Sequence, residues 1–355
     1  MHTSQVQEVI AALDNSFSGS IVHPISGGLI NTSFCIENPA GKKVFLQQIN
    51  EQVFARPEQI AANLLVIYTE LEKQNAAHSM AKPLAFENGA WLFRDTKGSC
   101  WRIADYIEAV TYQRAERPAQ LEMAVKSFAG FTALLKEVAL DKLYTTLADF
   151  HNLSLRFLQF QEAIATGHPG RRNEASYLIE GLLQRSTYAD LYQQMSQSPD
   201  DFKKRVMHHD AKLSNLLFDK KEDRVLAVAD LDTTMPGFFF SDLGDMVRSM
   251  SCSDDENSHQ PTRVSVVPAA YSMLYTQYRS ILSSQLTKAE TELLHGAGLL
   301  MIYMQSIRFL TDYLNGDRYY KTERVGQNLD RALHQFTLLC SVEEHLKKEY
   351  RFSVR

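Results

Sequence analysis

Short segments of β-branched and aromatic residues dominate the first hundred positions of this chain. Three of them lie at residues 20–24, 32–37 and 43–49, and clusters of glycine, asparagine and proline separate them as turns would. Two further segments of this kind cover residues 91–94 and 101–107. Because such runs bounded by turn residues are typical of strands, the pattern predicts a small β-sheet in this part of the chain.

Elsewhere the apolar residues follow the spacing of helices. One helix is predicted to begin at Pro57, inside the sheet region, because apolar side chains then recur every three or four positions. From Pro118 onward this spacing dominates, and the predicted helices cover residues 121–135, 174–195, 264–282, 287–314 and 327–349. In that part of the chain, only residues 216–218 and 225–229 have the pattern of strands.

A β-rich part followed by a longer helical part indicates an α+β fold with two lobes, in the manner of protein kinases. We expect a small first lobe over residues 1–108, made of the sheet and one helix, and a mostly helical second lobe over residues 109–355. The active site is expected between them. Many α+β enzymes share this layout, so the function has to be argued from the site itself.

Charge and composition exclude several classes of protein. The 355 residues are 45% hydrophobic and carry a net charge of −5, which argues against a nucleic-acid or membrane partner. The densest basic run, residues 203–205, is expected to be a solvated face. No apolar run is long enough for a membrane span, and the first residues lack the pattern of a signal peptide. The four cysteines are too dispersed for a disulfide framework or structural zinc, so we expect a cytoplasmic protein, monomeric or weakly dimeric.

Acidic and amide side chains around residue 210 occur in an order that suits phosphoryl transfer from ATP. Asp210 stands two residues after His208, and Asn215 follows five residues later. The apolar segment 225–229 then ends at Asp230. Phosphoryl transfer requires one carboxylate to receive a hydroxyl proton, then an amide and a second carboxylate to hold Mg²⁺. This order predicts a kinase.

Each of these side chains has an expected role. Asp210 is the candidate base, because a carboxylate is ionised at neutral pH and accepts a proton without prior activation. Asn215 and Asp230 are candidate Mg²⁺ ligands, since amide and carboxylate oxygens suit that ion. Asp232 is either a further metal ligand or a residue at the strand end that faces solvent. His208 is expected to brace the backbone around the metal-binding aspartate rather than to act in catalysis.

Two more aspartates follow in the segment that opens the next helix. Capping of that helix accounts for Asp242, and Asp245 could instead buttress the catalytic loop.

The motif of His208, Asp210 and Asn215, with Asp230 after the second strand, resembles the aminoglycoside phosphotransferase and choline kinase family. Longer stretches are similar to one branch, the bacterial N-acetylhexosamine 1-kinases. These stretches are residues 27–34 with 45–50, residues 230–237, and residues 307–314 with 316–320. The resemblance extends from about Gly27 to Tyr320 and so covers most of the chain.

This resemblance implies an ATP- and Mg²⁺-dependent transfer to the anomeric C1 hydroxyl of a small-molecule sugar, N-acetylgalactosamine or N-acetylglucosamine. Asp210 would face that hydroxyl, and Arg308, Asp317 and Tyr319 would lie near the sugar. The alternative for Arg308 is an arginine on the helix surface or in an ion pair within its lobe.

The resemblance also implies where the nucleotide binds. Gly27 and Gly28 would form the tip of a loop over the phosphates, and Ile107 lies in the interlobe connection expected to meet the adenine. The family normally carries Lys or Arg on the third strand to grip the α- and β-phosphates, where this chain has Gln48. Phosphate binding must therefore depend on Mg²⁺, backbone amides or another cation. The glutamate of the following helix that would pair with such a lysine is either Glu58 or Glu70.

Two other functions are open at this point. One is a kinase of another small alcohol, such as choline, homoserine, methylthioribose or an aminoglycoside. The other is a kinase fold that binds a ligand without catalysis. Gln48 favours this second alternative, and the presence of Asp210, Asn215 and Asp230 together opposes it.

Overall fold

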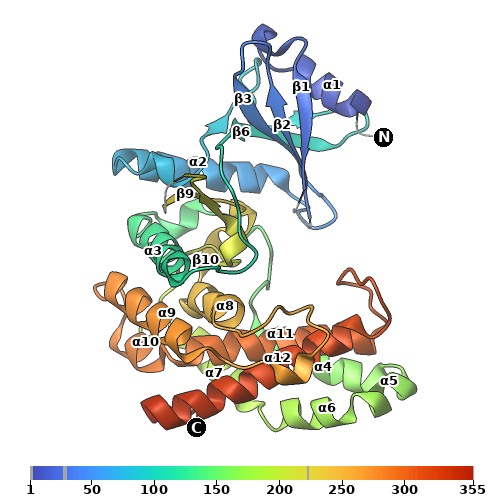
Figure 1. The fold of residues 1–355 in the computed structure, drawn as a ribbon, viewed down its shortest axis with the longest axis vertical. Coiled ribbons are helices and arrows are strands. Elements are labelled where there is room, and N and C mark those ends of the chain that lie inside the picture. Colours follow the sequence, from blue (N-terminus) through green and yellow to red (C-terminus); the bar gives the residue numbers. More distant parts are fainter. Residues whose placement is uncertain (1–2, 27–29, 222–223, 355) are drawn as a thin grey trace. The chain divides into compact units, whose positions relative to one another are not determined.

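The computed structural model describes residues 3–26, 30–221 and 224–354. The chain forms two compact units, and each unit is assembled from separate stretches of sequence (Figure 1). The first unit comprises Met1–Thr111, Leu134–Ala148 and Leu216–Pro236, and the second comprises Tyr112–Ala133, Asp149–Asn215 and Gly237–Arg355. The first contains the main sheet and the second is mostly helical, which confirms the predicted α+β fold class.

An antiparallel sheet forms the centre of the first unit. Its strands run in the order β1-β2-β3-β6-β4, and β5 pairs with β6. Their bounds are β1 Ile21–Ile25, β2 Thr32–Glu37, β3 Lys43–Gln48, β4 Pro83–Leu84, β5 Phe93–Arg94 and β6 Cys100–Asp105. The five predicted strand segments are confirmed. The short strand β4 was not predicted, because two residues carry no alternation to detect.

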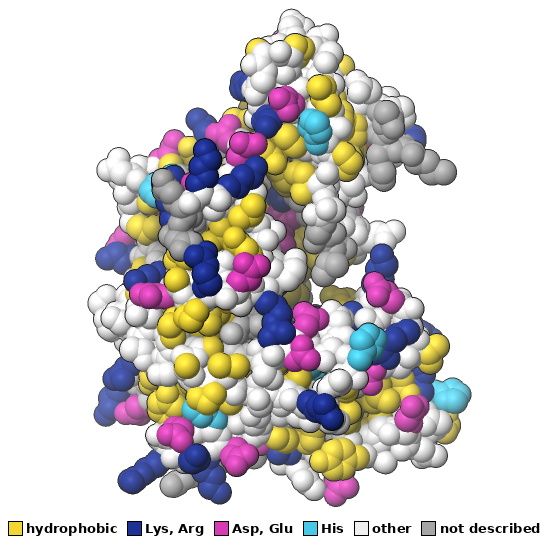
Figure 2. Space-filling view, in the orientation of Figure 1, with side chains coloured by type: hydrophobic (Ala, Val, Ile, Leu, Met, Phe, Trp, Pro, Cys, Tyr) yellow, Lys and Arg dark blue, Asp and Glu magenta, His cyan; other side chains and the backbone are white. Residues whose placement is uncertain are grey.

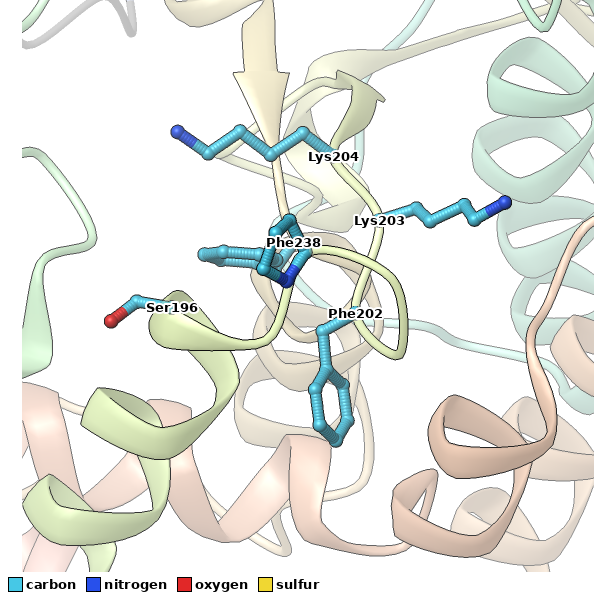
Figure 3. A pocket seen from close by; sticks show the side chains of 6 residues that line it. Ser196, Phe202, Lys203, Lys204 and Phe238 are labelled. Carbon is cyan, nitrogen blue, oxygen red and sulfur yellow. The ribbon is translucent and has the colours of Figure 1, made fainter.

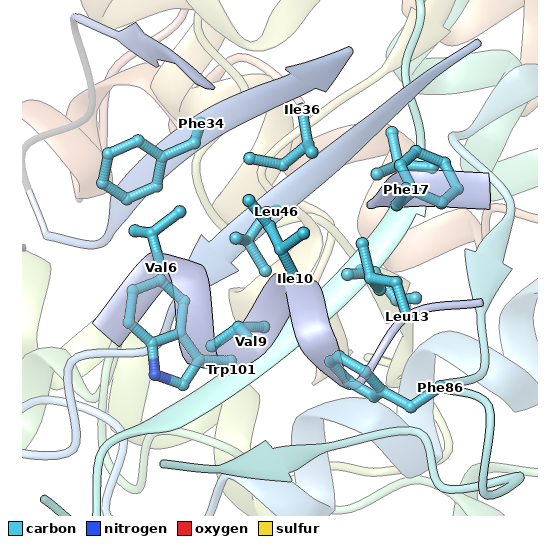
Figure 4. Packing of buried hydrophobic residues seen from close by; sticks show 12 residues of the cluster. Val6, Val9, Ile10, Leu13, Phe17, Phe34, Ile36, Leu46, Phe86 and Trp101 are labelled. Atoms are coloured by element: carbon cyan, nitrogen blue, oxygen red, sulfur yellow. The ribbon is translucent and has the colours of Figure 1, made fainter. Parts of the chain in front are cut away.

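One face of this sheet is apolar and packs against an N-terminal helix. Helix α1 (Thr3–Ala11) contributes Val6, Val9 and Ile10 to a buried cluster with strand residues such as Leu46 and Trp101 (Figure 4). Helix α1 was not predicted from the sequence, because the first twenty residues of the chain mix polar and apolar positions. Burial of this set is the main hydrophobic stabilisation of the sheet.

Helix α2 (Pro57–Lys73) belongs to the first unit and begins at the predicted proline. Its buried Asn63 donates hydrogen bonds from Nδ2 to the backbone oxygens of Tyr144 (2.8 Å) and Thr234 (3.2 Å). The helix therefore fixes the segment that follows the hairpin of β8 (Leu216–Phe218) and β9 (Val225–Val228).

Ten helices of the described residues begin in the second unit's stretches, and two short strands accompany them. The helices are α3 Pro118–Leu134, α4 Leu153–Thr166, α5 Pro169–Glu174, α6 Ser176–Leu183, α7 Thr187–Gln197, α8 Phe240–Met250, α9 Pro268–Ile281, α10 Lys288–Leu293, α11 Gly296–Leu314 and α12 Gln327–His345. The strands are β7 Arg205–Met207 and β10 Met235–Gly237, and β10 crosses the boundary between the units. Nearly every residue of α11 is buried, and α12 lies alongside it (Figure 1).

Helices α8 and α11 approach closely at Gly244. A Cβ atom at this position would lie 2.5 Å from the backbone oxygen of Ala297, which is closer than real Cβ atoms come to any atom. The contact therefore requires glycine.

Two long predicted helices are each interrupted. The segment 174–195 contains α6 and α7, which are separate helices on either side of Gln184. The segment 287–314 contains α10, opened by a capping box of Thr287 and Glu290, and then α11. Periodicity persists across such breaks because both helices bury the same kind of face.

The basic run at residues 203–205 is not wholly a solvated face, contrary to expectation. The side chain of Arg205 is only 10% exposed, and its Nη2 lies 2.7 Å from Oε2 of the fully buried Glu290. A buried guanidinium needs such a partner, because an unpaired charge in the interior is costly.

Two features of the described residues bear on a membrane or nucleic-acid partner. No helix there is long and apolar enough to cross a bilayer. On the face shown in Figure 2, acidic and basic side chains are interspersed over the surface.

His295, between α10 and α11, should make the stability of the second unit depend on pH. Its ring stacks on Tyr275 with centroids 3.9 Å apart, and burial lowers its pKa to about 4, helped by Arg279 and His345. As the pH falls below 6.5, the ordinary pKa of histidine, His295 takes up a proton in the unfolded chain but stays neutral in the folded one. The free energy of unfolding should therefore fall between those limits, by less than the full ~1.4 kcal/mol per pH unit because solvent reaches part of the ring.

Urea unfolding at pH 7 and pH 5 measures this effect. The loss should be smaller in His295→Phe than in the wild type, because burial also lowers the pKa values of His151, His334 and His345, and it should be unchanged in His259→Gln, which alters an exposed histidine of the same unit. An identical pH dependence in His295→Phe and the wild type would contradict the assignment.

Candidate active site

A buried carboxylate of α8 holds the loop that carries the predicted base. The backbone N–H groups of His208 and His209 donate to Asp242, at 3.0 Å to Oδ2 and 2.8 Å to Oδ1. Burial raises the pKa of Asp242, although His208 and the two N–H donors act in the opposite sense. The expectation that Asp242 caps α8 is wrong, because its acceptors are used by the loop. Asp245 instead forms an ion pair with Arg248 at 2.8 Å.

His209 adopts a left-handed backbone, with φ of 66°, inside this loop. Its Nδ1 lies 3.3 Å from Nδ1 of His151, whose pKa is lowered well below its usual value by burial and by the neighbouring His209. Gly237 provides room for the ring, since a Cβ there would lie 2.3 Å from Cε1 of His209. The ring of His209 therefore occupies space that a side chain at residue 237 would fill.

Asp210, the predicted base, lies in a network that favours its ionised form. Nζ of Lys212 is 2.8 Å from Oδ2, and Nδ2 of Asn215 donates to the same oxygen at 2.8 Å. Burial alone favours the protonated acid, but Lys212, His208 and Asn215 together keep the pKa of Asp210 below its usual value. The backbone N–H of Asp210 donates to Nδ1 of His208 at 3.2 Å, so that histidine braces the base itself.

Asn215 is oriented so that its amide oxygen remains available. Its Nδ2 donates both to the side chain and to the backbone oxygen of Asp210, each at 2.8 Å. Its Oδ1 accepts no hydrogen bond from the described residues. An amide oxygen without a hydrogen-bond donor is suited to a hard cation.

Asp230 and Asp232, which follow β9 in the first unit, differ sharply in environment. Asp230 is exposed and has a left-handed backbone, with φ of 57° and ψ of 52°. Asp232 is buried, so the alternative that it faces solvent is wrong. Its Oδ1 lies 2.5 Å from Nη2 of Arg102, and its Oδ2 accepts from Nδ2 of Asn31 at 2.7 Å. In the described residues there is no cluster of three or more His, Cys, Asp or Glu side chains that could hold a metal.

The predicted nucleotide residues fall in three places. Gly27 and Gly28 lie outside the described residues. Ile107 is half-buried in the connection that follows β6. Gln48 pairs in register with Trp101, whose side chain belongs to the cluster under α1, so Gln48 points to that face of the sheet. Gln47, the preceding residue of β3, points to the opposite face of the sheet.

Neither candidate glutamate of α2 has the role expected for it. Oε1 of Glu58 lies 3.2 Å from Nη2 of Arg94, and Oε2 of Glu70 lies 3.0 Å from Nζ of Lys73 on its own helix.

Arg308 is a buried residue of α11, contrary to the alternative of a surface arginine. Its guanidinium carbon lies 5.4 Å from the ring centroid of Phe150 and 5.6 Å from that of Tyr320. Its Nη1 donates to Gln305 at 3.3 Å, and it forms no ion pair within the described residues. Stacking between two aromatic faces holds the guanidinium plane in one orientation.

Asp312 organises the loop after α11, and the sequence analysis did not identify it. Its carboxylate accepts from the backbone N–H groups of Arg318, Tyr319 and Tyr320, at 2.8 to 2.9 Å. It stands one helical turn after Arg308 in the same stretch, which was the signal available in the sequence.

The two other predicted acceptor residues lie in that loop. Asp317 has φ of 57°, and its carboxylate accepts from Arg171 at 2.6 Å and from Asn328 at 2.9 Å. Tyr319 is exposed, and its ring packs edge-on against Tyr320. Asp317 therefore stabilises the loop, and Tyr319 is exposed in it beside Arg318.

A surface pocket of about 260 Å³ in the second unit involves none of the predicted residues. It is lined by Ser196, Pro199, Phe202, Lys203, Lys204 and Phe238. The two lysines point away from one another, and Nζ of Lys204 lies 5.7 Å from the ring centroid of Phe238 (Figure 3).

The chain matches one protein-family model and is similar in fold to several solved structures. The model of the "Phosphotransferase enzyme family" (APH) matches residues 21–264. A microcompartment-associated aminopropanol kinase is similar in structure, with a TM-score of 0.68, 14% identity and 99% of each chain covered. A choline kinase from Cryptosporidium parvum Iowa II has a TM-score of 0.59 and 11% identity, with 98% of this chain and 97% of that chain covered.

A third similar structure was solved with ligands. It is the amicoumacin kinase hAmiN in complex with AMP-PNP, Ca²⁺ and Ami, with a TM-score of 0.58 and 13% identity, covering 95% of this chain and 93% of that chain. At these levels of identity, the three structures show a common fold.

Proposed function

This chain belongs to the phosphotransferase enzyme family, and from that premise we propose that it is an ATP- and Mg²⁺-dependent kinase of N-acetylhexosamines, acting on the C1 hydroxyl. The observation that supports it best is the environment of Asp210. A cation and an amide keep its carboxylate ionised, and a buried aspartate fixes the loop that carries it. Such a carboxylate is ready to take a proton from an acceptor alcohol.

The residues proposed to hold Mg²⁺ fit that ion by the chemistry of their oxygens. Asn215 has an amide oxygen that accepts no hydrogen bond from the described residues, and Asp230 offers an exposed carboxylate. When bound, Mg²⁺ would neutralise charge on the phosphates. The complex of hAmiN with AMP-PNP and Ca²⁺ supports the use of a nucleotide and a divalent cation in this fold.

Asp210 would accept the acceptor proton as the hydroxyl oxygen attacks the γ-phosphate. Arg308 and the loop after α11 would position the acceptor, because a sugar has several hydroxyls and selecting one requires fixed hydrogen-bond donors. The two rings beside Arg308 and the carboxylate of Asp312 supply that rigidity.

A choline acceptor is the second candidate, since a choline kinase shares the fold. A quaternary ammonium is bound by open aromatic faces. Here the guanidinium of Arg308 already lies over Phe150 and Tyr320 and would repel a second cation. A polyhydroxy acceptor is compatible with these neighbours.

A coupled assay of ADP release across sugars and amino alcohols tests the proposal. We expect turnover with N-acetylgalactosamine or N-acetylglucosamine and none with choline or homoserine, because a site built for hydrogen bonds rejects acceptors that leave its polar groups unpaired. NMR of the product should locate the phosphate at C1. Arg308→Ala should raise KM for the sugar by about 10-fold or more, with little change for ATP.

Arg324→Ala is the matched control, since Arg324 is a more exposed arginine paired with Asp330. Phosphate at C6, or turnover only with a non-sugar, would overturn the sugar 1-kinase assignment and leave the kinase reaction standing.

A further inference from the structure

The face of the sheet opposite α1 carries a largely covered arginine, Arg102 of β6. Strand alternation places Trp101 and Ile103 in the apolar cluster on the side of α1, so Arg102 points to the opposite face. Its direct partner across the pair of β3 and β6 is Gln47. Its side chain is only 13% exposed, so its partners decide what it can do.

Half of the Arg102 guanidinium is committed to other residues. Nη2 forms the ion pair with Asp232 and also donates to Oε1 of Gln47. Asp232 is fixed in turn by Asn31, and Gln47 is fixed by its Nε2 bond to Ser33 at 2.9 Å. These contacts fix the direction of the guanidinium and occupy Nη2 with one hydrogen bond and one ion pair.

The other half of the guanidinium is unsatisfied. Nη1 of Arg102 is buried and has no hydrogen-bond partner within the described residues. Buried arginine nitrogens are rarely left in this state, because a desolvated donor without an acceptor is unfavourable. An oxyanion at this place would accept a hydrogen bond from Nη1.

We propose that Arg102 is the cation that binds the nucleotide phosphates, in place of the basic residue that β3 lacks, and that Asp232 is its anchor rather than a metal ligand. The inference rests on the proposed phosphotransferase function. It explains why Gln48 is neutral and points to the apolar side of the sheet. It also explains why neither Glu58 nor Glu70 of α2 pairs with Arg102. Oδ2 of Asp232 accepts a hydrogen bond from Asn31, and Oδ1 has the ion-pair contact with Arg102 but no hydrogen bond within the described residues.

This arrangement differs from a lysine on β3 in its geometry. A guanidinium held at one nitrogen by a carboxylate retains its charge and presents a second nitrogen in a fixed direction. Because Nη1 is buried, a phosphate oxygen reaches it only when the atoms that cover it move, and the nitrogen then gains a charge-assisted hydrogen bond.

The experiment measures binding of ATP, ADP and adenosine by isothermal titration calorimetry, in protein that has no acceptor and therefore does not turn over. Arg102→Gln should weaken ATP and ADP by about 10- to 100-fold, the usual range for losing a hydrogen bond to a charged group. Adenosine should bind as in the wild type, because it carries no phosphate. A purely structural arginine would weaken all three alike.

Two further variants keep the test decisive if Arg102→Gln leaves Asp232 unpaired and unstable. The double variant Arg102→Gln/Asp232→Asn removes both charges and should show the same selective loss for ATP and ADP. Adding Gln47→Lys to this double variant returns a cation on the strand directly opposite, and should recover most of the affinity for ATP. Arg94→Gln, which alters an exposed arginine of the adjacent strand β5, should change nothing.

Equal ATP affinity in the wild type and in the folded double variant would overturn the inference while the kinase proposal stands. A parallel loss for adenosine would also overturn it, in favour of a structural role. A wild-type protein that binds no ATP with Mg²⁺ present would overturn the proposed function, and the inference with it.

Discussion

Replacement of Asp210 by asparagine is expected to lower kcat by about 10²- to 10⁴-fold with little change in the affinity for ATP. The carboxylate receives the acceptor proton, and an amide of the same shape cannot. The loop should keep its form, because Asp242 holds it through the backbone of His208 and His209 and not through the side chain at residue 210. Steady-state kinetics with the sugar acceptor, combined with calorimetric titration of ATP, measures both quantities.

Asp230→Asn is the informative comparison. It should abolish the Mg²⁺-dependent part of ATP binding, because the proposed metal ligand acts on the donor and not on the acceptor. Lys126→Met, on an exposed face of α3, should leave both parameters unchanged. Equal loss of ATP binding in Asp210→Asn and Asp230→Asn would refute the separation of roles.

The second large effect is expected from Asp242→Ala, which should lower the free energy of unfolding by about 3 kcal/mol. The change removes two hydrogen bonds to a carboxylate and leaves the N–H groups of His208 and His209 buried without acceptors. The same variant should lose activity, because the loop that carries Asp210 is released. Urea-induced unfolding and the coupled ADP assay measure the two consequences.

Asp242→Asn retains one acceptor oxygen and should lose about half as much stability. Asp254→Ala, which alters an exposed carboxylate of the same unit paired with Arg114, should change the free energy by less than about 1 kcal/mol. Wild-type stability of Asp242→Ala would show that the loop is held by other contacts.

The sequence predicted the sheet and most helices because their signals are local. Strands β2 and β3 were identified from their residue types and turns, and α2 from its proline and apolar spacing. Such features depend on neighbours within a few positions, which a single sequence contains. Whether α6 and α7 are continuous depends instead on packing by the rest of the unit, and there the prediction was wrong.

The residues around Arg102 show why part of the candidate site was not predicted. Residues Phe45 and Leu46 are both apolar, so the alternation of β3 does not reveal which face α1 covers. The position of the neutral glutamine could therefore not be assigned to a face. Arg102 and Asp232 are 130 positions apart, and one chain offers no sign that they are paired.

Asp210, Asn215 and Asp230 were identified because phosphoryl transfer requires those groups in that order along the chain. Asp312 was missed although it stands beside Arg308 in the helix. Its role depends on three backbone N–H groups of a loop whose path the sequence does not determine.

The discontinuity of the first unit has a consequence for how the protein is made. The carboxylate that neutralises Arg102 arrives with the stretch Leu216–Pro236, long after the sheet has been synthesised. On the ribosome, more than a hundred further residues are synthesised after the sheet before Asp232 emerges. During that time the guanidinium of Arg102 has no carboxylate partner. A long separation between contacting segments also slows folding. The nascent first unit should therefore be a target for chaperones and proteases until β8 and β9 emerge, and a gene fragment that ends at Thr111 should yield an unstable product.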